Sequence, residues 1–226
     1  MRENCTSGTV GGPLVTEVPT VRGITLNFGV IYMNEWKAKD GAVDIGSYNS
    51  EKTKILWILR EPNGKDFDFL EYLSDPRVYP RWKSTYGLVV KTSDAIFNGA
   101  KDKPDYPYPK DIPALMKRIA LVNIKKTGGK SSSIPEEIME YAKNNKEEMK
   151  EQLRELSPDV IILAGTDWYF LTEIRLHIRE ITGKDTKIIS ASHPNQRKIK
   201  HGDYIGNILR EFRSVGCGEE RTASIA

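Results

Sequence analysis

The stretch Ile55-Leu56-Trp57-Ile58-Leu59 is a run of five apolar residues that ends at the charged pair Arg60-Glu61. A continuous apolar run of this length is typical of a strand that is buried on both faces of a sheet. Comparable short runs follow at residues 119–122, 160–164 and 187–190. We therefore expect four strands of this kind in one sheet.

Helical patterns separate the runs. Residues 135–156 carry apolar side chains at helical spacing and charges on the other face. Further helices are predicted over residues 111–118, 167–181 and 203–212. Strands that alternate with helices predict an α/β fold, three-layer α/β/α with a central four-stranded parallel sheet.

The predicted domain spans residues 51–214. Residues 1–50 lack clear periodicity and are rich in Gly, Thr, Asn and Ser, so we expect an irregular N-terminal arm packed on the body. Short β-type pieces are possible there, around residues 14–21 and 24–32. Residues 215–226 are expected to form a flexible C-terminal tail.

Composition narrows the class of protein. The chain has 226 residues, with 34 Lys and Arg against 31 Asp and Glu, so its formal net charge is +3. This excludes a polycation that binds by bulk charge, but it permits a nucleic-acid enzyme with a local basic face. Two isolated cysteines, Cys5 and Cys217, cannot form a disulfide framework or a four-cysteine metal site. We expect a cytoplasmic protein without a membrane span.

Polar residues follow each apolar run. Glu61 comes just after the first run, Asn123 ends the second, Gly165 follows the third and His193 comes shortly after the fourth. In parallel α/β sheets, ligands bind beyond the carboxyl ends of the strands. The sequence therefore predicts an active site at which these side chains converge.

The order of these motifs resembles the uracil-DNA glycosylase superfamily. The resemblance covers roughly residues 52–212 and rests on four segments: Arg60-Glu61-Pro62-Asn63-Gly64, Leu121-Val122-Asn123-Ile124-Lys125-Lys126, Ser157-Pro158-Asp159-Val160-Ile161-Ile162-Leu163-Ala164-Gly165 and Ser192-His193-Pro194-Asn195. It implies a hydrolase that cleaves the N-glycosidic bond of uracil or another deaminated base in DNA, in base excision repair and without a cofactor or metal. The chain departs from the family where Glu61 replaces Asp or Asn and Asn195 replaces Ser.

Base removal requires a flipped base, a donor for the charge that develops on it, and a carboxylate near the sugar. By this resemblance Glu61 is the catalytic carboxylate and His193 the donor to the base oxygen. An ion pair of Glu61 with Arg60 or Lys65, and a structural role for His193, are the alternatives. Asn123 can present a donor and an acceptor to a base edge, or can cap a turn.

Two further sets of residues complete the expected site. Asn63 and Tyr86 are the other candidates for base binding. Two basic loops are expected to contact DNA phosphates. The alternative is that both loops are ordinary solvated surface. The first loop contains Lys125, Lys126 and Lys130, and the second contains Asn195, Arg197, Lys198 and Lys200. The segment 136–155 carries seven acids against four bases and is expected to face away from DNA.

Other classes of protein agree less well with the sequence. Gly129-Lys130-Ser131 lacks the glycine that a phosphate loop needs five positions earlier, where Ile124 stands, so a nucleoside triphosphatase is excluded. The main alternative is a catalytically divergent protein on the same fold that binds nucleic acid, a nucleobase or a nucleotide, and a nuclease or phosphatase ranks behind it because the sequence shows no carboxylate cluster typical of a metal site. The expected partner is single- or double-stranded DNA, with the protein acting as a monomer.

Overall fold

A computed structural model of the chain describes residues 39–62, 79–101, 105–128 and 133–214. Of residues 79–85 only the backbone is described. All described residues belong to the unit Trp36–Ala226. The predicted arm up to residue 38, including its two β-type pieces, and the predicted tail 215–226 lie outside the described residues.

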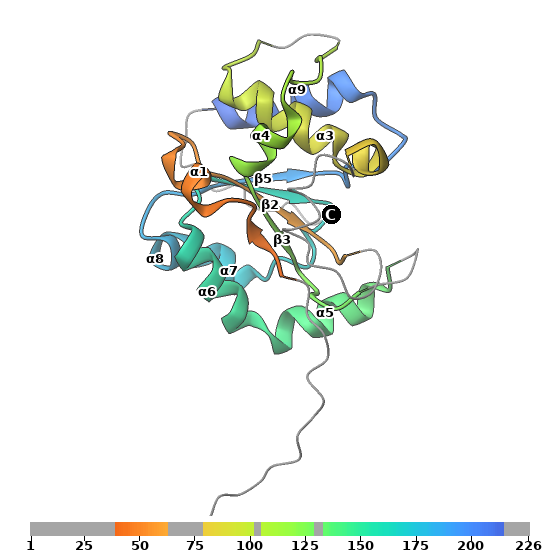
Figure 1. Cartoon of the computed structure of the whole chain (residues 1–226). Helices are drawn as coiled ribbons and strands as arrows, with labels where there is room; N and C mark the ends of the chain where they lie inside the picture. The colour runs from red at the N-terminus through yellow and green to blue at the C-terminus, as the bar shows by residue number, and fades with distance from the viewer. Residues whose placement is uncertain (1–38, 63–78, 102–104, 129–132, 215–226) are drawn as a thin grey trace, which may run out of the picture. The chain divides into compact units, whose positions relative to one another are not determined.

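The described core is a sheet of five strands in the order β1-β3-β2-β4-β5 (Figure 1). The strands are β1 (Gly41–Ala42), β2 (Ile55–Leu59), β3 (Ala120–Asn123), β4 (Val160–Ala164) and β5 (Lys187–Ala191). The four strands expected from the apolar runs are parallel to one another. This confirms an α/β fold with a mostly parallel sheet.

The expectation of a sheet with four parallel strands alone is wrong, because β1 adds a fifth strand at the edge. It runs antiparallel to β3, with Gly41 opposite Leu121 and Ala42 opposite Ala120. Two residues are too short to show a period-two pattern, so the sequence gives no strand signal there. Both β1 and helix α1 (Ile45–Ser50) fall within the range that the sequence assigned to an irregular arm.

Helices cover both faces of the sheet. Figure 1 shows α3, α4 and α9 on one side and α5 to α8 on the other. Their bounds are α3 (Tyr79–Phe97), α4 (Ile112–Lys117), α5 (Pro135–Asn144), α6 (Lys146–Leu156), α7 (Thr172–Leu176), α8 (Ile178–Thr182) and α9 (His201–Arg213). None of the helices in the described part of the chain is long and apolar enough to cross a membrane.

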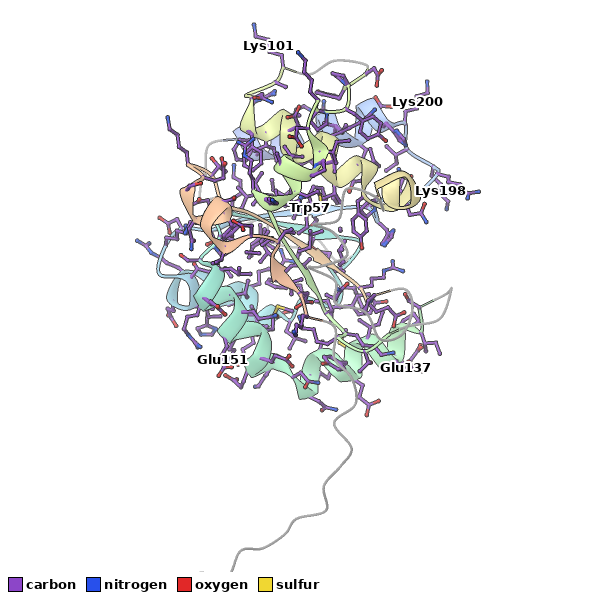
Figure 2. All side chains as sticks on the ribbon, viewed as in Figure 1. Trp57, Lys101, Glu137, Glu151, Lys198 and Lys200 are labelled. Atoms are coloured by element: carbon purple, nitrogen blue, oxygen red, sulfur yellow. The ribbon has the colours of Figure 1, made fainter. Side chains whose placement is uncertain are left out.

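The side chains of β2 point alternately to the two faces of the sheet, so they belong to two separate parts of the core. Ile55, Trp57 and Leu59 pack with residues of α3, α4 and α9, whereas Leu56 and Ile58 pack with residues of α5 to α8. The indole Nε1 of Trp57 donates to Ser93 Oγ at 3.0 Å, so its polar atom is satisfied in the interior (Figure 2). A strand buried on both faces explains why the run is continuously apolar.

Two helices predicted as continuous are each broken once. Residues 135–156 form α5 and α6, with Asn145 (φ −116°, ψ 26°) between them. The apolar period continues through the break because both helices bury their residues in the same core. The helix predicted over 167–181 begins later than expected, because residues 167–171 are not helical, and the remainder forms α7 and α8 with a break at His177.

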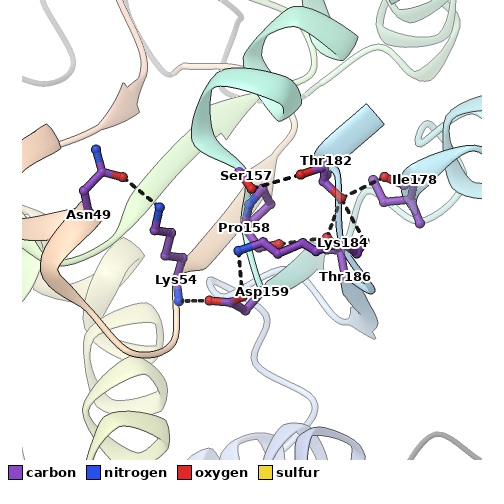
Figure 3. A network of polar contacts seen from close by, with 9 residues as sticks. All are labelled: Asn49, Lys54, Ser157, Pro158, Asp159, Ile178, Thr182, Lys184 and Thr186. Atoms are coloured by element: carbon purple, nitrogen blue, oxygen red, sulfur yellow. Dashed lines mark hydrogen bonds and ion pairs between the residues drawn. The ribbon is translucent and has the colours of Figure 1, made fainter. Parts of the chain in front are cut away.

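A polar network joins the amino ends of three strands (Figure 3). Asp159 accepts from the backbone N of Lys54 at 2.7 Å and from Lys184 Nζ at 2.6 Å. Ser157 Oγ donates to Thr182 O at 2.9 Å. These contacts fix the amino edge of the sheet, opposite the edge at which the candidate site lies.

Candidate functional site

The carboxyl ends of four strands meet at one edge. Leu59 of β2 lies opposite Asn123 of β3, and Ala164 of β4 lies opposite Ala191 of β5. The residues that follow these positions therefore share this edge. Along the edge, Glu61 follows the central strand β2 and His193 follows the edge strand β5, with β4 between them.

Glu61 is buried beside a lysine. Its side chain is 6% exposed, and its Oε2 lies 3.2 Å from Lys125 Nζ. The same ammonium lies 2.8 Å from Glu137 Oε2 of α5. Burial by itself lowers the pKa of Lys125, but the hydrogen bonds to Glu137 and Glu61 outweigh it and raise the pKa above its usual value. Lys125 therefore holds one oxygen of Glu61 as a fixed cation.

The other oxygen of Glu61 has no such partner among the residues that the structure describes. Oε1 is buried and makes no hydrogen bond to any residue in the described ranges. Buried polar atoms are nearly always paired, so an unpaired carboxylate oxygen at a strand end needs an explanation. Of the ion-pair partners weighed from the sequence, Arg60 bonds elsewhere and Lys65 lies outside the described residues. The partner is Lys125 instead.

A hydrogen bond fixes the tautomer of the neutral His193 ring. Its Nδ1 accepts a hydrogen bond from the backbone N of Asn195 at 3.1 Å. The proton of the neutral ring therefore lies on Nε2, which makes Nε2 a donor. Burial, and then the positive charge of Arg60, lower the pKa of His193 and favour the neutral ring.

Gly165 allows the His193 loop to approach β4. Its φ of +70° lies in the left-handed region, and a Cβ there would lie 3.0 Å from both the Cβ and the backbone N of His193. Its own N donates to Ala191 O at 2.7 Å. Only glycine fits this position without strain.

Asn123 and Lys126 lie in a buried cluster around Asp40. Asn123 is 1% exposed, and Asp40 Oδ2 accepts from its backbone N at 2.7 Å and from its Nδ2 at 3.5 Å. Lys126 Nζ lies 3.0 and 2.9 Å from the two Asp40 oxygens and 2.7 Å from Gln152 Oε1. Gln152 Nε2 in turn donates to Asp40 Oδ1 at 2.9 Å.

This cluster changes the interpretation of two predicted residues. The three hydrogens of the Lys126 ammonium have three protein acceptors, so Lys126 is an interior cation and not a surface contact for phosphate. Asn123 directs its amide nitrogen to Asp40, so it does not present that donor to a base in this structure. Sequence reasoning missed Asp40 because it falls in the segment that was expected to be an irregular arm.

The second basic loop is exposed. Asn195, Arg197, Lys198 and Lys200 all lie on the surface between β5 and α9, and Figure 2 shows Lys198 and Lys200 reaching outward. Gln196 braces the loop, because its Oε1 accepts from the backbone N of Lys198 and of Ile199 at 2.7 Å each. This loop can meet phosphates.

The other predicted contacts are placed differently or not described. Asn63 and Lys130 lie outside the described residues. Tyr86 is partly buried against the core between the sheet and α3. The acidic segment 136–155 was expected to face away from DNA. It does not do so wholly, because Glu137 in the first turn of α5 contacts Lys125.

The loop after β4 exposes a tryptophan. Trp168 is 83% exposed, although its neighbours Tyr169 and Phe170 are buried. Thr166 anchors the loop by donating from Oγ1 to Ile58 O at 2.9 Å. A groove lined in part by Met139 of α5 lies beside Trp168. Nothing in the sequence distinguishes this tryptophan from a core residue.

Asp167, just before Trp168, belongs to a separate surface pair. It accepts from Ser190 Oγ and lies 2.8 Å from Arg175 Nη2. The hydrogen bond from Ser190, followed by the charge of Arg175, lowers the pKa of Asp167 despite its partial burial. No group of three or more His, Cys, Asp or Glu residues in the described ranges is arranged to hold a metal ion.

Comparisons with protein-family models, with curated proteins and with solved structures find no match to this chain.

Proposed function

We propose that this protein is a divergent uracil-DNA glycosylase-like enzyme that hydrolyses the N-glycosidic bond of uracil or another deaminated base in DNA. The observation that carries the proposal is the unpaired, buried Oε1 of Glu61. It lies at the end of β2, on the same sheet edge as the neutral donor His193. The order of the motifs along the chain supports the same assignment.

Glu61 supplies the carboxylate in this mechanism. Lys125 holds Oε2, so Oε1 is left to accept a hydrogen bond from the attacking water or to stabilise the cationic sugar. A side chain that is held from one oxygen and buried is also fixed in direction. Lys125 is therefore a positioning residue rather than a contact for DNA.

His193 supplies the hydrogen-bond donor. Its neutral ring carries the proton on Nε2, which would donate to the base oxygen as that oxygen gains negative charge. The lowered pKa keeps the ring in this form at neutral pH. Asn195 is part of this device, because its backbone N fixes the tautomer.

DNA would lie across the exposed loops of the same edge. Arg197, Lys198 and Lys200 supply charge for phosphates. Trp168 supplies an exposed aromatic face on which a base can stack. We propose that the protein acts as a cytoplasmic monomer on single- or double-stranded DNA.

The test is release of free base from uracil-, hypoxanthine- and xanthine-containing oligonucleotides, in single- and double-stranded form. The wild type is expected to release at least one of these bases, and Glu61→Gln and His193→Ala to lose that activity. Glu151→Gln is the matched control, because Glu151 is exposed on α6 (Figure 2). Activity that survives both site substitutions would show that the residues are wrongly assigned.

A second candidate is a protein on the same fold that binds nucleic acid or a nucleobase without cleaving it. The replacement of Asp or Asn by Glu61, and the burial of Asn123 against Asp40, favour it. This candidate predicts salt-dependent binding to single-stranded DNA with no release of base. The absence of binding at low salt would exclude both candidates.

A further inference from the structure

Arg60 connects the end of β2 to the residue that follows the neighbouring strand β4. It follows β2 directly, and its Nε donates to Gly165 O, just past β4, at 3.0 Å. Gly165 is the residue whose missing Cβ allows the backbone of His193 to approach. Arg60 and His193 are thus held against the same glycine.

Among the described residues, the end of the Arg60 side chain has no acidic partner. Apart from the bond at Nε, its guanidinium makes no hydrogen bond or ion pair with any residue that the structure describes. Two other arginines of the domain behave differently: Arg118 pairs with Glu51, and Arg175 pairs with Asp167. A partly buried guanidinium with two free terminal nitrogens is suited to an external anion.

The carboxylate nearest in sequence is committed to another strand. Glu61 follows Arg60 but pairs with Lys125, beyond the end of β3. On the other side of the His193 loop, α9 presents the neutral Tyr204, whose hydroxyl donates to Ser192 O at 2.9 Å. Within the loop itself, Arg197 is exposed and basic. The charged group that acts on the His193 ring is Arg60, which is cationic, and the nearby acid Asp167 pairs with Arg175.

We propose that Arg60, beside the His193 loop, forms an anion subsite that takes a phosphate group. The two Nη atoms form a planar fork that matches two oxygens of a phosphate. Its occupant is the phosphodiester next to the target nucleotide, and in this form the inference rests on the proposed function. The subsite explains why an arginine that pairs with no acid of the described ranges follows the central strand β2.

The subsite has a measurable consequence for His193. The charge of Arg60 opposes protonation of the ring, and a phosphate bound to Arg60 cancels that charge. Phosphate therefore raises the pKa of His193. By linkage, protonation of His193 strengthens phosphate binding by the same factor.

The experiment is an NMR titration of the histidine ring signals with pH, at constant ionic strength, with and without inorganic phosphate. We expect phosphate to raise the pKa of His193 saturably, by roughly half a unit to one unit. The exposed His177 and His201 serve as internal controls and should not respond in this way. An unchanged pKa of His193 at tens of millimolar phosphate would overturn the subsite.

Two variants locate the effect. Arg60→Gln keeps a donor for Gly165 O but removes the charge, so the pKa of His193 should rise in the free protein and no longer respond to phosphate. Arg179→Gln, on an exposed arginine of α8, should behave as wild type. A phosphate response that is equally large in Arg60→Gln would overturn the assignment to Arg60.

A third titration, with a thymidine dinucleotide that has one phosphodiester, separates free phosphate from the DNA backbone. A response to both ligands supports the proposal. A response to inorganic phosphate alone overturns the DNA backbone as the occupant. A response to both ligands in a protein that releases no base leaves the subsite standing and removes only the glycosylase activity, so the two failures are distinguishable.

Discussion

Asp40→Asn tests the buried cluster at the end of β3. The side chain of Asp40 is 1% exposed and that of Lys126 is 4% exposed. The cluster connects Asp40, which precedes β1, to the end of β3 and, through Gln152, to α6. The substitution keeps the shape of the side chain but removes the charge that balances Lys126.

The expected loss in the free energy of unfolding follows from the burial of this ion pair. Removing one partner of a buried ion pair leaves an uncompensated buried charge, which costs about 3–5 kcal/mol. Domains are stable by only about 5–15 kcal/mol, so this is a large fraction of the total. With a urea dependence of about 2 kcal/mol per M, the unfolding midpoint should fall by about 1.5–2.5 M.

Urea unfolding followed by circular dichroism at pH 7 measures the change. Asp185→Asn is the matched control, because Asp185 and Arg179 form a pair whose side chains are 82% and 77% exposed. That control should change stability by no more than about 0.5 kcal/mol. Adding Lys126→Met to Asp40→Asn removes the uncompensated charge while the Asn oxygen still accepts from the backbone N of Asn123, so the double variant should recover part of the loss. The reasoning fails if Asp40→Asn is as mild as the control.

Three further outcomes are expected. Gly165→Ala should destabilise the protein more than Gly183→Ala in urea unfolding, because both glycines have left-handed φ but a Cβ at Gly183 meets open space; equal costs would contradict the contact with His193. Because folding lowers the pKa of His193, the unfolded state binds more protons below about pH 6.5. Stability should therefore fall as the pH drops below this value, and an equal slope in His193→Gln would contradict this. Trp168→Ala should weaken single-stranded DNA binding by about 1–3 kcal/mol, measured by fluorescence anisotropy, with little change in stability; unchanged binding would remove Trp168 from the interface.

Three of the four parallel strands, β2, β3 and β4, were predictable because they are buried on both faces, whereas β5 at the edge of the sheet is mostly only partly buried. All five side chains of β2 and all five of β4 are buried, which requires continuous apolar runs. The edge position of Glu61 and His193 followed from the same pattern, since residues after parallel strands share one edge.

Other features of the fold and of the candidate site were not predictable from the sequence. Lys126 lies in the interior because Asp40, far away in the sequence, supplies a buried carboxylate. The break at Asn145 leaves no mark, because the apolar period continues across it. Trp168 is exposed in a loop that Thr166 anchors to Ile58, far away in the sequence. The Asp40–Lys126 pair and the anchoring of the Trp168 loop by Thr166 are tertiary contacts, which local patterns do not encode.

The most direct test of the central claim is single-turnover release of uracil, hypoxanthine or xanthine from DNA, comparing wild type with Glu61→Gln. We predict release by the wild type, a loss of about 10²–10⁴-fold in Glu61→Gln, and no loss in the Glu151→Gln control. Failure of the wild type to release any of the three bases, or equal rates for wild type and Glu61→Gln, would contradict the account.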